Sequence, residues 1–207
     1  MKEFKAQDFT HLRGTKGFSE ELLNVHFKLY EGYVKNTNKA INMMNEKVEA
    51  GDFDYDFGEV RRRFGWEFNG MRLHEYYFGL MTPDGSERDK DTTLSKMIDD
   101  TWGSFSKWQS DFSGTGKMRG IGWACLAYDP WSERLFNTWL NEHDAGPLAG
   151  TIPVLLLDVF EHAFMRDYGK DKASYFKAYY NAIDWAKVNE WFDTARKGTK
   201  EIAAVVH

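Results

Sequence analysis

The stretch that decides the fold is Val154-Leu155-Leu156-Leu157-Asp158-Val159-Phe160-Glu161-His162-Ala163, an apolar run that ends in a carboxylate and, four residues later, an imidazole. The run is short, begins with a β-branched residue and follows Gly150 and Pro153, which is the pattern of a buried strand. If a helical turn begins at Asp158, the i to i+4 spacing places Asp158 and His162 on the same side. A carboxylate is costly to bury unless it is paired or bound to a metal. The pair therefore predicts half of a transition-metal site, and the alternative is a helix N-cap Asp beside an ordinary histidine.

Composition limits the classes of protein that this chain can belong to. The 207 residues can bury a real core as one domain or two small ones. With 42% apolar and 16% aromatic residues a disordered chain is excluded, and a net charge of −5 argues against nucleic acid as the main partner. The single cysteine, Cys125, permits neither an intrachain disulfide nor a cysteine-based metal cage. We find no signal peptide and no membrane span, so we expect a soluble protein of the reducing cytoplasm.

The spacing of apolar residues predicts an α+β fold. Two long helices, at about 19–49 and 57–80, would form an antiparallel N-terminal helical hairpin in a domain spanning 1–83. The polar, turn-rich stretch at about 84–91 is the expected linker. The second domain, 92–207, should hold a three-stranded antiparallel sheet flanked by helices, with Gly114-Thr115-Gly116 as a loop. We expect its strands at about 120–128, 134–141 and 152–158, and its helices at about 93–102, 104–112, 160–168, 172–182 and 186–197.

Two further histidines extend the metal-site hypothesis. His26 lies on the first long helix and His74 lies near the end of the second, so antiparallel packing could bring the two to the same height. Either one alone would more often be an ordinary core histidine. Together with Asp158 and His162 they make three imidazoles and one carboxylate, a set that suits iron or manganese with a position left for solvent. The set matches structural zinc poorly, because zinc favours thiolates or a closed tetrahedron.

These residues resemble those of the iron/manganese superoxide dismutases. Asp158-Val159-Phe160-Glu161-His162-Ala163 is similar to the family signature D-x-W-E-H-A, with Phe160 where Trp is usual. The remaining matches follow in family order from about residue 18 to 195. They are His26 followed by Tyr33-Val34-Lys35-Asn36, Phe68-Asn69-Gly70-Met71-Arg72-Leu73-His74, Gly122-Trp123-Ala124, and Tyr180-Asn181-Ala182-Ile183-Asp184-Trp185.

The resemblance implies a superoxide dismutase, which converts two superoxide anions and two protons to dioxygen and hydrogen peroxide. It implies one Fe or Mn ion per chain and the metal ligands His26, His74, Asp158 and His162. Glu161 matches the residue that pairs with the partner subunit's ligand histidine. A homodimer, or a tetramer of two dimers, is therefore expected. The ligand types suit iron and manganese alike.

The resemblance also assigns roles around the metal. His143 falls where a glutamine often holds the metal-bound solvent, and Gly70 would leave room for a side chain that arrives from the sheet. Trp123 and Phe160 would narrow the channel to small species. The gateway tyrosine normally lies eight residues after the first ligand, whereas Tyr33 lies seven and Tyr30 four residues after His26.

Either tyrosine could reach the channel, and we favour Tyr33 because Val34 and Asn36 follow it as in the family. Cys125 and Met165 stand where Trp and Tyr are common. These departures affect the path of proton delivery more than the metal site.

Two other classes of protein use similar residues. Two histidines and a carboxylate also form the iron site of non-haem oxygenases, but a third histidine leaves fewer open positions and argues against such an enzyme. A catalytically inactive relative that serves as an interaction protein would be favoured by the loss of a ligand. None of the four ligand types is lost.

Overall fold

The computed structural model describes residues 2–206, and its N-terminal half is a long helical hairpin. Helix α1 spans Glu20–Ala50 and helix α2 spans Tyr55–Gly79. Ser19 begins α1 by accepting a hydrogen bond from the Leu22 amide, and Gly51, at φ 68°, ends it in the left-handed region that glycine adopts without strain. Asp54 caps α2 in the same manner as Ser19 caps α1. The predicted hairpin is confirmed, and α2 begins two residues earlier than expected because of this cap.

The C-terminal half contains a three-stranded antiparallel sheet, and the predicted α+β class is confirmed. The strands are β1 at Gly122–Asp129, β2 at Arg134–Asn141 and β3 at Ile152–Asp158, in the spatial order β2-β1-β3. The helices are α3 at Thr93–Trp102, α4 at Phe105–Gly116, α5 at Glu161–Tyr168, α6 at Lys172–Ala182 and α7 at Trp185–Val206, and a 3₁₀ turn covers Thr10–Leu12.

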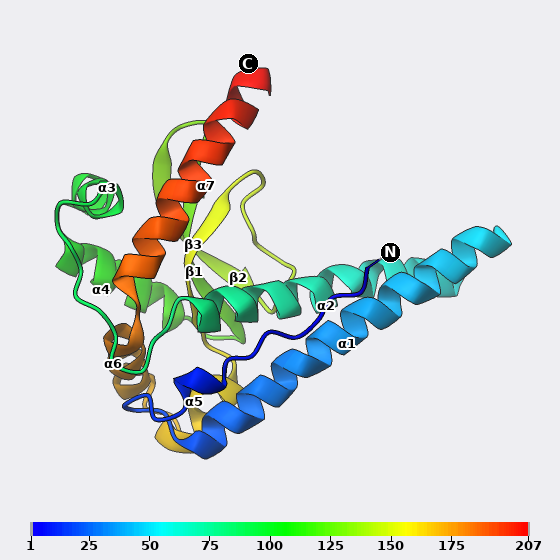
Figure 1. The fold of residues 1–207 in the computed structure, drawn as a ribbon, viewed down its shortest axis with the longest axis horizontal. Helices are drawn as coiled ribbons and strands as arrows, with labels where there is room; N and C mark the ends of the chain where they lie inside the picture. Colours follow the sequence, from blue (N-terminus) through cyan, green and yellow to red (C-terminus); the bar gives the residue numbers. More distant parts are fainter. Residues whose placement is uncertain (1, 207) are drawn as a thin grey trace.

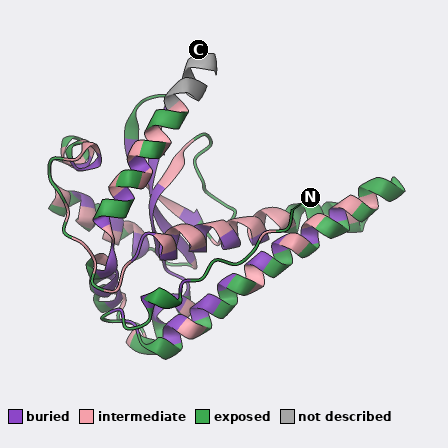
Figure 2. Cartoon of the chain, in the orientation of Figure 1, coloured by how far each residue is buried: buried purple, intermediate pink, exposed green. Residues whose placement is uncertain are grey.

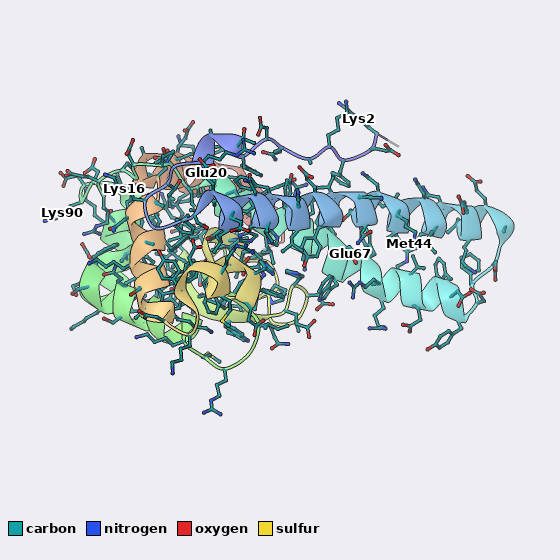
Figure 3. The ribbon with its side chains drawn as sticks, turned by 90° about the horizontal axis from the view of Figure 1, so that it is seen from below. Lys2, Lys16, Glu20, Met44, Glu67 and Lys90 are labelled. Atoms are coloured by element: carbon teal, nitrogen blue, oxygen red, sulfur yellow. The ribbon has the colours of Figure 1, made fainter. Side chains whose placement is uncertain are left out.

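Helices from both halves of the chain surround the sheet (Figure 1). Helix α4 packs on β1 and β2, whereas α2 and α7 pack on β3. The far end of the hairpin extends past the sheet and its covering helices, and it is largely exposed (Figure 2). Figure 3 shows this arm after a 90° turn, with Glu67 labelled near the body of the molecule and Met44 labelled farther out along the arm. No helix within residues 2–206 is long and apolar enough to cross a membrane.

One predicted loop is wrong. Gly114-Thr115-Gly116 forms the last turn of α4 instead. A side chain at Gly116 would bring its Cβ to 2.9 Å from the Phe176 ring and 3.2 Å from Leu157, so the glycine is there to let the helix end pack closely. Tertiary packing explains this glycine, and no local turn requires it.

Strand β1 lies at the centre of the sheet and sets the position of the residues at its end. Residues 122–128 of this strand are buried, and Trp123 pairs with Asp158 of β3 in the register. The Val159 amide donates a hydrogen bond to the Gly122 carbonyl oxygen at 2.9 Å. A Cβ at Gly122 would collide with the carbonyl oxygen of Leu140 on β2. The glycine therefore lets three segments meet where β3 ends at Asp158.

Candidate metal centre

Four side chains from four separate elements converge on one point. His26 comes from α1, His74 from α2, Asp158 from the end of β3 and His162 from the first turn of α5. One potential ligand atom from each lies within 4.8 Å of all the others. The Nε2 atoms of His26, His74 and His162 lie 3.1, 3.5 and 3.3 Å from Asp158 Oδ2. The sequence prediction that these four residues come together is confirmed.

Hydrogen bonds orient two of the four groups toward this point. His74 Nδ1 donates to the Gly70 carbonyl oxygen at 2.6 Å, which leaves the Nε2 lone pair directed at the centre. The Phe160 amide donates to Asp158 Oδ1 at 2.8 Å and leaves Oδ2 facing the three rings. The Tyr175 hydroxyl donates to the Asp158 carbonyl oxygen at 2.7 Å and holds the backbone below the carboxylate.

The unpaired atoms of this cluster fit a cation. His74 Nε2 and His162 Nε2 are buried and have no hydrogen-bond partner among the described residues. Buried polar atoms without partners are costly, and a metal ion at this point would satisfy both. Burial lowers the pKa of His26 and of His74, so both rings are neutral, which is the form that binds metal. Burial alone would raise the pKa of Asp158, but His162 and His26 outweigh it and lower the pKa.

His143 lies beside this centre on the connection after β2, and its side chain is fully buried. Trp123 Nε1, which can only donate, bonds His143 Nδ1 at 3.1 Å. The proton of the neutral ring is therefore on Nε2, which donates to the Tyr33 hydroxyl oxygen at 2.9 Å. Burial lowers the pKa of His143 to about 4, so the ring is neutral at pH 7. The His143 ring stacks on Phe160 with centroids 4.6 Å apart.

Tyr33 links His143 to the ligand His74. Its ring stacks on that of His74, with centroids 5.3 Å apart and an interplanar angle of 29°. A Cβ at Gly70 would lie 2.6 Å from Tyr33 Cδ1. The expected role of Gly70 toward a side chain from the sheet stays a prediction, and the nearest side chain at Gly70 is that of Tyr33. Tyr33 occupies that space, because residues seven apart share a helix face and Tyr33 thus faces α2 together with His26.

Tyr30 does not take the place of Tyr33. Its hydroxyl accepts a hydrogen bond from the Gln7 amide at 2.9 Å and donates to Glu75 Oε1 at 3.0 Å. Burial is the main cause of the raised pKa of Tyr30, and it is also the main cause of the raised pKa of Tyr33. Both hydroxyls stay protonated at pH 7, but only that of Tyr33 contacts His143.

The centre is closest to solvent on the side of α5. The His162 side chain is 18% exposed, whereas those of His26, His74 and Asp158 are 0–1% exposed. Glu161, the first residue of α5, is exposed, and Phe160 before it is buried. Trp123 covers the centre from β1, with its ring 5.0 Å from that of His74 and nearly perpendicular to it.

Sequence reasoning missed one residue that borders the site. Trp66 contacts the rings of both His143 and Tyr33, with centroids 4.6 and 5.4 Å away. The signal was present, because Trp66, Gly70 and His74 are spaced by four residues and so lie along one face of α2. Asn69, which the quoted match to the family included without a role, donates from Nδ2 to the His143 carbonyl oxygen at 2.9 Å.

The helical hairpin supplies two histidines, and the C-terminal half with the three-stranded sheet supplies an aspartate and a third histidine. This fold and this centre define the class of mononuclear metalloproteins. Residues 90–191 match the model of the C-terminal domain of iron/manganese superoxide dismutases. A manganese superoxide dismutase of Haloferax volcanii is 33% identical over 168 residues, which are 81% of this chain and 83% of the relative.

Relatives named for other metals have similar identities. An iron superoxide dismutase of Pyrobaculum aerophilum is 32% identical over 87% of this chain and 86% of its own, and a manganese/iron enzyme of Aeropyrum pernix is 30% identical over 88% and 86%. The chain belongs to the iron/manganese superoxide dismutase family.

Proposed function

We propose that this chain dismutates superoxide, converting two superoxide anions and two protons to dioxygen and hydrogen peroxide at one Fe or Mn ion. The observation that carries the proposal is the cluster of His26, His74, Asp158 and His162, in which Nε2 of His74 and Nε2 of His162 are buried without a hydrogen-bond partner among the described residues. The neutral pair of His143 and Tyr33 lies directly beside it.

When bound, the ion supplies the one-electron couple that takes an electron from one superoxide and gives it to a second. The protein must supply a low net charge and two protons. The Asp158 carboxylate offsets part of the positive charge while the imidazoles stay neutral. His143 uses both nitrogens on protein atoms, so the Tyr33 O–H is the group left free to donate toward the centre. The rings of Trp123 and Phe160 narrow the path to the centre, so that only small molecules can reach it.

We further propose that the active form is a homodimer in which α5 faces its counterpart. Glu161 is exposed next to His162, the most accessible ligand, and Met165 on the same helix is 47% exposed. A partner carboxylate could then accept a hydrogen bond from a ligand imidazole and hold its orientation. Pairing of dimers into tetramers would be compatible with the exposed hairpin arm. We place the protein in the reducing cytoplasm, in keeping with its single buried cysteine.

The division into residues 1–83 and 92–207 is also a proposal. The centre draws two ligands from each side of the linker at 84–91, so in this division neither part holds a complete metal site. Assembly of the site then requires the two parts to dock.

Elemental analysis combined with a superoxide-decay assay tests the function. The purified chain should hold close to one Fe or Mn per chain, and the protein reloaded with each metal should remove superoxide catalytically. An inactive interaction protein would not accelerate decay with either metal. An iron enzyme of another class would bind iron and leave superoxide decay at the uncatalysed rate. Either result would refute the proposal.

A further inference from the structure

The loop that carries His143 has an unusual backbone. Glu142, immediately before His143, has φ 52°, in the left-handed region that non-glycine residues rarely adopt. The loop is closed by the Asn141 amide, which donates to the Ala145 carbonyl oxygen at 2.6 Å, and by the Glu142 amide, which donates to the Ile121 carbonyl oxygen at 2.9 Å. Such a conformation persists only where the surroundings determine it strongly.

Two side chains of helix α2 also hold this loop in place. Trp66 Nε1 donates a hydrogen bond to Glu142 Oε2 at 3.0 Å, and one turn later Asn69 Nδ2 donates to the His143 carbonyl oxygen at 2.9 Å. The side chain of Glu142 and the backbone of His143 are thus both bound to one face of α2. The neighbouring residues Asn141, Asp144 and Ala145 are exposed, so their side chains supply little packing to the loop.

The indole of Trp66 also contacts the two groups that face the centre. Its ring lies edge-on to His143 at 4.6 Å and to Tyr33 at 5.4 Å, with interplanar angles of 70° and 61°. The Arg63 guanidinium lies 3.7 Å from the Trp66 ring centroid and forms an ion pair with Glu67 at 2.8 Å. Trp66 is therefore held on its outer face by a cation and on its N–H edge by a carboxylate.

We propose that the hydrogen bond between Trp66 and Glu142 is a tether that positions His143 against Tyr33. The tether acts through the loop: Glu142 directs the backbone inward, and the Trp66 ring limits how far the imidazole can rotate away from the Tyr33 hydroxyl. Trp66 and Glu142 are positioning residues. This inference rests on the proposed dismutase function for its activity readout, but the contacts it describes belong to the protein alone.

Three variants of the tether separate it from simple packing. Trp66→Phe keeps an aromatic ring and removes the N–H donor, whereas Glu142→Ala removes the acceptor. Glu142→Gln keeps an amide oxygen that can still accept. Trp191→Phe is the matched control. Trp191 lies on α7, away from His143, and the substitution removes an indole N–H that donates to the Pro153 carbonyl oxygen at 2.9 Å.

The measurements are metal content, the dismutation rate per metal ion and the reduction potential of the loaded protein. Trp66→Phe and Glu142→Ala should each lower the rate by about tenfold and shift the potential in the same direction, with metal content unchanged, because small displacements of a positioned group are costly. Glu142→Gln should retain at least half the wild-type rate, and Trp191→Phe should match wild type in rate and potential.

The double variant decides the case. If one tether links the two residues, Trp66→Phe combined with Glu142→Ala should be no slower than either single variant. Losses that multiply, or single variants with wild-type rate and potential, would overturn the proposal. If the wild-type protein itself does not dismutate superoxide, the proposed function fails, and the tether is then judged by the potential shifts and their non-additivity alone.

Discussion

His143 Nε2 lies 2.9 Å from the Tyr33 hydroxyl oxygen although 110 residues separate them in the chain. The contact joins the loop after β2 to the middle of α1, across the face of α2 at Gly70. Because Trp123 occupies the other nitrogen of His143, the direction of this hydrogen bond is settled: the imidazole donates and the phenol accepts. The Tyr33 proton is therefore directed elsewhere, and two of the predictions below, at His143 and Gly70, test this contact.

Replacing His162 with Ala should abolish stoichiometric metal and activity together. The substitution removes one of three nitrogen donors, and the remaining Asp158 carboxylate keeps only two imidazole neighbours. Metal per chain, measured by elemental analysis, should fall to a small fraction of the wild-type value. His11→Ala is the control, because His11 is an exposed histidine outside the cluster. A His162→Ala protein that keeps full metal occupancy would show that the ligand set is wrong.

Replacing His143 with Ala should leave metal binding largely intact, since His143 is not among the four clustered residues. The dismutation rate at neutral pH should fall by about an order of magnitude or more, as is typical when a group that handles protons is removed. Rates are compared per metal ion by following superoxide decay directly. If His143→Ala keeps the wild-type rate, another residue must have this role, and Tyr33 is the next to test.

Replacing Gly70 with Ala should displace Tyr33. The new Cβ would lie 2.6–2.9 Å from three atoms of the Tyr33 ring, including Cγ, so the whole ring has to move and its bond to His143 is lost or lengthened. We expect a lower rate per metal ion and a lower melting temperature.

Gly65→Ala is the matched control on the same helix, because a Cβ there meets no atom within 4 Å. This variant should gain up to about 1 kcal/mol of stability from helix propensity alone and keep its rate. If Gly70→Ala and Gly65→Ala had the same rate per metal ion and the same melting temperature, the contact between Gly70 and the Tyr33 ring would be contradicted.

Replacing Glu161 with Ala should weaken the proposed dimer and reduce metal retention. Glu161 is exposed on the isolated chain next to His162, where a partner subunit could reach it. Sedimentation velocity at several micromolar concentrations should show more monomer than in the wild type. Glu190→Ala removes an exposed glutamate from α7 and should leave the distribution unchanged. A fully active wild-type monomer would argue against the dimer.

The Cys125 thiol should be inert in the folded protein. Burial raises its pKa to about 12, from an ordinary value of 9.0, so the thiolate fraction is negligible at pH 8. A chromogenic disulfide reagent should therefore label none of the native protein and one thiol per chain after unfolding in guanidinium. Because the unfolded chain releases this proton first, the thiol's contribution to stability is full below pH 9 and is lost as the pH rises toward 12. Rapid labelling of native protein at pH 8 would contradict the burial.

Local pattern in the sequence predicted the elements and brought out the candidate ligands, and the family resemblance then implied the ligand set. The apolar run before Asp158 marks a strand, and α5 begins three residues later at Glu161, so Asp158 and His162 come from two consecutive elements and do not share one helical turn. His26 and His74 could be paired in advance because two long helices joined by a short turn must run antiparallel. These inferences depend on periodicity along one segment, which the order of residues specifies directly.

Only the tertiary structure decided the surroundings of the centre. Whether Tyr30 or Tyr33 reaches His143, and which side chain uses the space at Gly70, depends on how far α1 rotates against α2. Both tyrosines lie on the buried side of α1, so periodicity along α1 cannot distinguish them. The proton position on His143 and the bond from Trp66 to Glu142 likewise arise from contacts between distant segments. Differences of an ångström decide them, and the sequence pattern carries no information at that scale.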